Sequence, residues 1–115
     1  MKYMIQVFTT NATDELERLP EIAKESIFAE YVALSQAGEV LDGNQLQPAC
    51  TATTVRVQGA GVVTTAGPFT EPGEPLGGYY LIDARDLDAA IGFAARIPAA
   101  RMGGAVEVRG VVDRL

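Results

Sequence analysis

Residues 63–83, VTTAGPFTEPGEPLGGYYLID, constrain the fold most, because they join two predicted strands through a segment rich in glycine and proline. Residues 63–65 are β-branched, and residues 79–82 form an apolar run of strand length. The residues that control the backbone between them are Gly67, Pro68, Pro72, Gly73, Pro75, Gly77 and Gly78. Glycines of this kind permit positive φ and close approach of chain to chain. A simple connection between two strands requires fewer glycines and prolines, so we expect the loop to hold a functional group in place.

The N-terminal part predicts a strand followed by a helix. Residues 2–8 are rich in Tyr, Ile, Val and Phe, as in a strand buried on both faces. Pro20 is expected at the first helical position, where its missing N–H costs nothing, and Gly38 is expected to end the helix in a left-handed cap. The predicted apolar stripe of this helix is Ile27, Phe28, Tyr31, Val32 and Leu34.

The middle of the chain predicts a β-hairpin. Before the hairpin, Asp42-Gly43 indicates a turn and Leu46 indicates a short strand. Residues 53–57 and 62–65 are β-branched runs separated by residues 58–61, which is a hairpin pattern. The Gly-x-Gly within residues 59–61 precedes a strand and no helix, so we interpret it as turn glycine and not as a phosphate-binding loop.

The C-terminal part predicts a strand, a second helix and a final edge strand. Asp86 is a predicted N-cap and Pro98 a predicted stop. The predicted buried stripe of this helix is Leu87, Ile91 and Ala94, with Ala90 and Ala95 allowing close packing. Residues 105–109 alternate between apolar and other side chains, as in an edge strand, and Val111 and Val112 are expected to extend it.

These elements predict an α+β fold for a single domain spanning residues 1–115. Without the inserted β-hairpin, the order is βαββαβ, the ferredoxin-like arrangement of an antiparallel sheet with two helices on one face. Two helices cover only one face, yet residues 79–82 are apolar on both sides. We therefore expect a homodimer that packs sheet against sheet, forming a dimeric α+β barrel.

Charge and composition exclude several classes of function. Nine basic and fifteen acidic residues give a net charge of −6, which repels a nucleic-acid backbone. No run is apolar for long enough to span a membrane, and we expect a cytoplasmic protein. The sequence has no histidine, which removes histidine-based catalysis and metal sites. We expect neither a metal nor another cofactor, and Cys50, the one cysteine, is expected to be an inert core residue.

Several motifs occur together in one order along nearly the whole chain. They are MKYM at the start, LQP with TATTVRV at residues 46–57, GPF with Glu71, LGGYYLI at residues 76–82, DLD at residues 86–88, and ARIPAAR with AVEVR at residues 95–109. In these blocks the chain resembles the YCII-related proteins of the DGPF subgroup, small bacterial proteins with a dimeric ferredoxin-like fold. The resemblance implies a link to extracytoplasmic-function sigma factors, beside which such proteins are often encoded.

The chain departs from the family pattern at three positions, and two of these departures remove a titratable group. Ala66 stands where the family motif has its aspartate, Thr70 stands where it has alanine, and Met102 stands where members often carry histidine. The wider superfamily is suspected of acid–base chemistry through a His-Asp pair. If the family uses the aspartate or the histidine in this way, we expect this chain not to do so.

Six residues are the candidates for a site. Glu71 in the loop and a tyrosine are candidate acid–base groups, and the alternative for Glu71 is a solvated residue or a cap. Tyr79 and Tyr80 are expected on opposite faces of their strand, as ligand contacts or as core aromatics. Phe69 is a further candidate for ligand binding, and it is also expected to anchor the loop by burial. Arg56 and Arg101 are the last two candidates for ligand binding. The alternative for both arginines is a structural ion pair, such as Arg101 with Glu107 or Asp83.

Three functions follow from these observations. The first is a dimeric binding or accessory protein with a cleft near the dimer interface for a small molecule or for a sigma-factor-type partner. The second is a cofactor-free enzyme of the dimeric α+β barrel type, using Glu71 and Tyr80 for acid–base chemistry, which rests on fold analogy. The third is a structural protein without a ligand.

Overall fold

The computed structural model describes residues 1–9, 15–69 and 75–113. Its elements are β1 (Lys2–Phe8), α2 (Glu21–Ser35), β2 (Val40–Gln45), the 3₁₀ helix η1 (Ala49–Thr51), β3 (Thr53–Gln58), β4 (Gly61–Ala66), β5 (Leu76–Asp83), α3 (Leu87–Ala95), the 3₁₀ helix η2 (Pro98–Ala100) and β6 (Ala105–Gly110). Apart from β3 and β4, this is the predicted βαββαβ order. The predicted α+β, ferredoxin-like fold with an inserted hairpin is confirmed.

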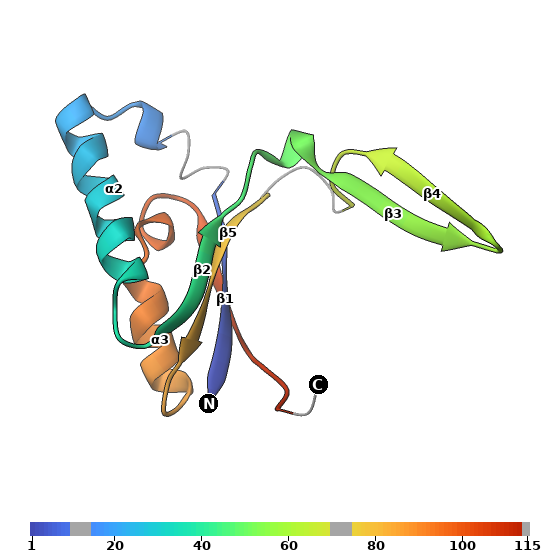
Figure 1. Cartoon of the computed structure of the whole chain (residues 1–115). Helices are drawn as coiled ribbons and strands as arrows, with labels where there is room; N and C mark the ends of the chain where they lie inside the picture. Colours follow the sequence, from blue (N-terminus) through green and yellow to red (C-terminus); the bar gives the residue numbers. More distant parts are fainter. Residues whose placement is uncertain (10–14, 70–74, 114–115) are drawn as a thin grey trace.

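Four strands form an antiparallel sheet in the order β2-β5-β1-β6. In this register Ile5 lies opposite Tyr80 on one side and Val108 on the other. Both α2 and α3 lie on the same side of the sheet (Figure 1). In the described ranges, neither α2 nor α3 covers the other face of the sheet, as predicted (Figure 1).

The core lies between the sheet and the two helices. Tyr3, Ile5 and Val7 alternate along β1 with partly exposed neighbours, so one face of the strand is buried under the helices. The ring of Phe93 on α3 meets Tyr80 edge to face, with ring centroids 5.4 Å apart. Burial of these aromatic and branched side chains is the main source of stability for a sheet covered on one face.

Helix α3 begins as predicted but buries a different stripe. The Asp86 carboxylate accepts a hydrogen bond from the Ala89 N–H at 2.8 Å, which confirms the N-cap. Its buried residues are Ala90, Phe93 and Ala94. Leu87, Ile91 and Ala95 are exposed, so the predicted stripe is right only at Ala90 and Ala94. The helix is rotated because Phe93 packs against the sheet.

Three local predictions in the first half are wrong. Pro20 is the N-cap of α2, one residue before the first helical position. The helix ends on Gln36 with right-handed backbone, and Gly38 does not adopt positive φ. Asp42 and Gly43 lie inside β2 at a register irregularity, not in a turn. Leu46 follows β2, and its N–H donates to the Gly77 carbonyl oxygen at 2.9 Å.

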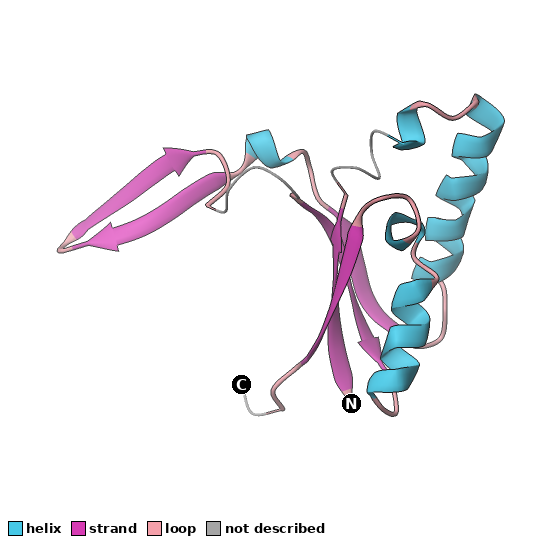
Figure 2. Cartoon of the chain, turned by 180° about the vertical axis from the view of Figure 1, so that it is seen from behind, coloured by secondary structure: helices cyan, strands magenta, loops and turns pink. Residues whose placement is uncertain are grey.

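Strands β3 and β4 form a two-stranded sheet of their own. We call residues 53–66 the arm. Its turn is Gly59-Ala60, and Gly59 has a φ of 60°, as the first position of a type II′ turn requires. The arm projects on the side of the four-stranded sheet opposite α2 and α3 (Figures 1 and 2). The predicted hairpin is confirmed, and it stands clear of the core.

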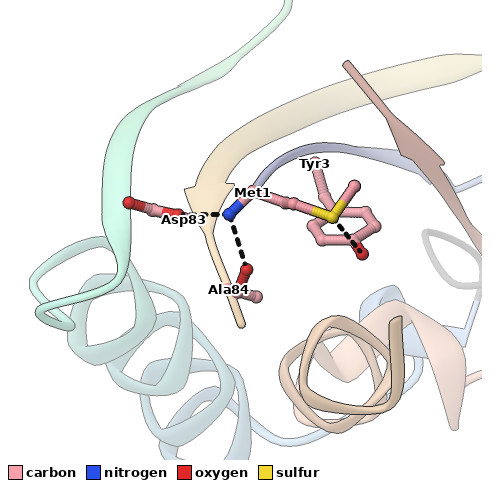
Figure 3. Close-up of polar contacts among 4 residues, drawn as sticks. All are labelled: Met1, Tyr3, Asp83 and Ala84. Atoms are coloured by element: carbon pink, nitrogen blue, oxygen red, sulfur yellow. Dashed lines mark hydrogen bonds and ion pairs between the residues drawn. The ribbon is translucent and has the colours of Figure 1, made fainter. Parts of the chain in front are cut away.

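The start of β1 is fastened to the end of β5. The Met1 amine lies 3.0 Å from Asp83 Oδ1 and donates to the Ala84 carbonyl oxygen at 3.0 Å (Figure 3). The Tyr3 hydroxyl lies 3.8 Å from the Met1 sulfur. Strand β6 ends at Gly110, short of the predicted extension, although the Val111 N–H donates to the Lys2 carbonyl oxygen at 2.9 Å.

None of the helices in the described ranges is long and apolar enough to cross a bilayer.

Candidate functional site

A cleft of about 290 Å³ opens between α2 and the half of the sheet formed by β2 and β5. Helix α2 lines it with Lys24, Ile27 and Tyr31, and the strands line it with Gly43 and Tyr80 among others. Ligand pockets in proteins typically measure about 300–1,000 Å³. The cleft therefore fits a compact small molecule.

Glycines of β2 and β5 allow neighbouring atoms to pack closely along the lining of this cleft. A Cβ on Gly43 would lie 2.8 Å from Tyr80 Cδ1. A Cβ on Gly77 would lie 2.5 Å from Thr9 Oγ1, and one on Gly78 would lie 3.0 Å from the Asn44 carbonyl oxygen. The prediction of close approach at Gly77 and Gly78 is confirmed. Gly67, at the end of the arm, has a φ of 101°, which confirms its predicted positive φ.

Lys24 is the one charged side chain among the described residues that line the cleft. It follows the helical spacing that places Lys24, Ile27 and Tyr31 on one side of α2. Its ammonium lies 3.9 Å from Glu21 Oε1, a long contact to a carboxylate that is itself well exposed. A pair of this kind contributes little, so the ammonium remains able to bind an anionic group of a ligand.

Two tyrosines connect the sheet to the helical layer beside the cleft. The Tyr80 hydroxyl donates to the Tyr31 carbonyl oxygen at 3.4 Å, and the Tyr31 hydroxyl accepts from the Ala99 N–H at 3.2 Å. Burial raises the pKa of Tyr31 above its usual range, although the hydrogen bond from Ala99 and the charge of Arg101 oppose it. Burial and the neighbouring Tyr31 raise the pKa of Tyr80. Both hydroxyls therefore keep their protons at neutral pH and serve as hydrogen-bonding groups.

Tyr79 and Tyr80 face opposite sides of β5, as predicted. Tyr80 is buried beneath the helices, whereas the Tyr79 hydroxyl donates to Asp42 Oδ2 at 2.9 Å on the other side. The Asn44 amide donates to the same hydroxyl at 2.9 Å. Both residues border the cleft at the β2–β5 edge, although the Tyr79 hydroxyl is held by Asp42 and Asn44 on the other face of the sheet.

Arg56 and Phe69 come together at the arm, away from the cleft lining. The Arg56 guanidinium lies 4.8 Å from the centre of the Phe69 ring. Phe69 is 71% exposed, so the prediction that its burial anchors the loop is wrong. The loop is instead closed by the Gly67 N–H, which donates to the Ala52 carbonyl oxygen at 2.7 Å, and by the Thr54 hydroxyl, which donates to the Gly67 carbonyl oxygen at 2.9 Å. Cys50 is also exposed, not in the core as predicted, because η1 lies on this outer connection.

Arg101 makes a structural ion pair, but with a different partner from those predicted. Its guanidinium donates to the Glu30 carboxylate on α2, which raises the pKa of Arg101. The expected partners are engaged elsewhere, Glu107 with Arg109 at 2.8 Å and Asp83 with the Met1 amine. The pair joins the turn after η2 to helix α2 across the surface.

The structure does not bring the five described candidates together in one site. Glu71 lies outside the described residues. Ala66 ends β4, and Met102 is buried against the core. Within residues 1–9, 15–69 and 75–113, no group of three or more Cys, Asp or Glu side chains lies close enough together to hold a metal ion.

Sequence reasoning missed Lys24 and Gly43 as parts of the cleft. A signal for Lys24 was present, because it continues the helical spacing of Ile27 and Tyr31 by one turn. Gly43 was assigned to a turn, and its contact with Tyr80 depends on the pairing of β2 with β5. Such a long-range pairing leaves no local signal in the sequence.

Comparison with known proteins supports the resemblance found in the sequence. Residues 1–114 match the model of the YCII-related domain. An uncharacterized protein of Rhizobium meliloti (strain 1021) is 38% identical over 80 residues, which cover 69% of this chain and 62% of that protein. The chain thus spans less than two thirds of this relative. The finer assignment to the DGPF subgroup stays a prediction.

Proposed function

The chain belongs to the YCII-related family and has its ferredoxin-like fold, and we propose that it is a homodimeric binding protein for a small organic anion. The ligand occupies the cleft between α2 and the β2–β5 half of the sheet. The observation that carries this proposal is the combination of a cleft of about 290 Å³ with Lys24 as the one charged group among its described lining residues.

The cleft supports the binding of a molecule with one anionic end and an apolar body. Ile27, Phe28 and Val7 supply apolar surface, whereas the Lys24 ammonium supplies a charge and hydrogen-bond donors. An anion paired with an ammonium in a partly dry cleft makes a charge-assisted hydrogen bond, which is stronger than a neutral one. The chain as a whole carries a charge of −6, so binding of an anion depends on this local cation.

The uncovered face of the sheet supports the homodimer. Met4 lies opposite Leu81 in the pairing of β1 with β5, and both alternate with residues buried under the helices. Phe8 lies on the same side of β1 as Met4. A two-fold axis that brings two such faces together buries the apolar side chains of both copies.

A thermal-shift screen of small organic carboxylates and phosphates tests the ligand proposal, because any compound that binds the native state raises its melting temperature. We expect hits among anionic compounds with an apolar body, and we expect Lys24→Gln to abolish their shifts. Lys2→Gln is the matched control, since Lys2 is the only other lysine and is absent from the cleft lining. Shifts that are equal in the wild type and in Lys24→Gln would contradict an anion site at Lys24.

A sigma-factor-type protein partner is a second candidate, which the exposure of Phe69 favours. A bulky aromatic that is 71% exposed beside an arginine is the kind of side chain that protein interfaces bury. We expect a cognate sigma factor to co-purify with the wild type and to be lost from Phe69→Ala. Absence of binding to the wild type at micromolar concentration would rule this partner out.

A further inference from the structure

The arm has two chemically different faces. Paired residues of an antiparallel ribbon share a face, so Val57 and Val62 lie on one side together with Val55. The other side carries Arg56 and Gln58, and Phe69 stacks on Arg56. The arm is therefore amphipathic, although among the described strands it forms a sheet of only β3 and β4.

The apolar face of the arm is largely exposed to solvent, which is unfavourable for an isolated two-stranded ribbon. Val55, Val57 and Val62 are 60%, 71% and 69% exposed, whereas Val63 on the opposite face is 41% exposed. A two-stranded hairpin alone is marginally stable in water, and three adjacent β-branched side chains give it an unsatisfied apolar surface. The arm requires a surface to pack on.

The position and the charge of the arm indicate which body covers its apolar face. The arm leaves on the side of the four-stranded sheet opposite α2 and α3, as both views show (Figures 1 and 2). Any body that covers this sheet face comes to lie beside the arm. The arm carries one charge, the positive charge of Arg56, whereas the whole chain carries −6, so the arm has no negative charge that would repel a second acidic copy.

We propose that the arm of one copy docks through Val55, Val57 and Val62 on the four-stranded body of a second copy. This inference rests on the proposed homodimer and adds to it a reciprocal embrace, in which each copy holds the other by its arm. The two-fold symmetry that joins the sheet faces makes the two arm contacts equivalent.

Photo-crosslinking from the two faces of the arm tests the embrace. The photoreactive residue p-benzoylphenylalanine is placed at Val57 or, as the matched control, at Gln58, its neighbour on the polar face. Mixed ¹⁴N- and ¹⁵N-labelled chains distinguish adducts between copies from adducts within one copy. We expect adducts from position 57 on the partner's residues 1–45 or 76–113, and at least about tenfold fewer from position 58.

The oligomeric state separates the failure of this inference from that of the homodimer. If the protein sediments as a monomer, both fail. If it sediments as a dimer but position 57 gives adducts only within its own chain or only on the partner's arm, the homodimer stands and the embrace is wrong. As a second readout, Val57→Asp should weaken the dimer by at least about tenfold and Gln58→Asp should not, because only the first buries a charge. Equal effects of the two variants would overturn the proposal.

Discussion

Gly43 lies against the ring of Tyr80, so that a Cβ at this position would be only 2.8 Å from Tyr80 Cδ1. The Tyr80 ring therefore occupies the space that a side chain at position 43 would need, beside the cleft. We therefore predict that Gly43→Ala displaces the Tyr80 ring and lowers the free energy of unfolding by about 1–3 kcal/mol. The midpoint of urea unfolding measures this loss, and Gly92→Ala is the control, because no neighbouring atom of the described residues lies within 4 Å of its added Cβ. An alanine in place of Gly92 inside α3 should stabilise the protein by about 0.5–1 kcal/mol, and equal midpoints for the two variants would contradict the packing argument.

The buried tyrosines predict a loss of stability at alkaline pH. Tyr31 and Tyr80 have raised pKa values in the folded protein, chiefly because burial disfavours the phenolate. Their contribution is fully present below the ordinary tyrosine pKa of about 10 and is lost as the pH rises through the folded values. Urea unfolding at a series of pH values above about 9 should show this fall, and Tyr80→Phe should make it shallower. A fall of the same slope in the wild type and in Tyr80→Phe would show that Tyr80 does not contribute.

The N-cap of α3 predicts a specific pattern of substitution. Asp86→Ala removes the acceptor of the Ala89 N–H and should cost about 1 kcal/mol of stability. Asp86→Asn keeps an acceptor oxygen and should cost much less. Chemical unfolding of both variants checks the difference. If the two variants are equally destabilised, the loss comes from the charge of Asp86 and not from its hydrogen bond.

The Arg101–Glu30 pair is predicted to contribute little to stability, despite its close contact. Both side chains remain well exposed, at 50% and 40%, so water and salt weaken the attraction between them. A double-mutant cycle with Arg101→Ala and Glu30→Ala should give a coupling energy below about 1 kcal/mol. A larger coupling that persists at high salt would mean that the pair locks η2 onto α2.

The sequence predicts an element correctly where its local pattern of residues agrees with the way that the element packs in the fold. Residues 2–8 and the hairpin of residues 53–66 carry strong strand signals, and Asp86 has the chemistry of an N-cap. The buried side of α3 could not be assigned in the same way, because Leu87 and Ile91 are as apolar as Phe93. Only the meeting of Phe93 with Tyr80 decides which side faces the sheet.

The cleft was less predictable than the fold. Tyr79 and Tyr80 were identified from their strand, but their neighbours come from α2 and β2, which lie far away in the sequence. The burial predicted for Phe69 and Cys50 was wrong because apolar character alone does not tell a core residue from one on a projecting connection. The arm places its apolar valines outside the core in the same way.

Isothermal titration calorimetry with the anionic compound that gives the largest thermal shift tests the central claim most directly. The titration compares wild-type protein with Lys24→Gln and with the control Lys2→Gln. The account predicts saturable binding of one molecule per chain to the wild type and to Lys2→Gln, and an affinity at least about tenfold weaker for Lys24→Gln. The same affinity in all three proteins would contradict a cleft that binds its ligand through Lys24.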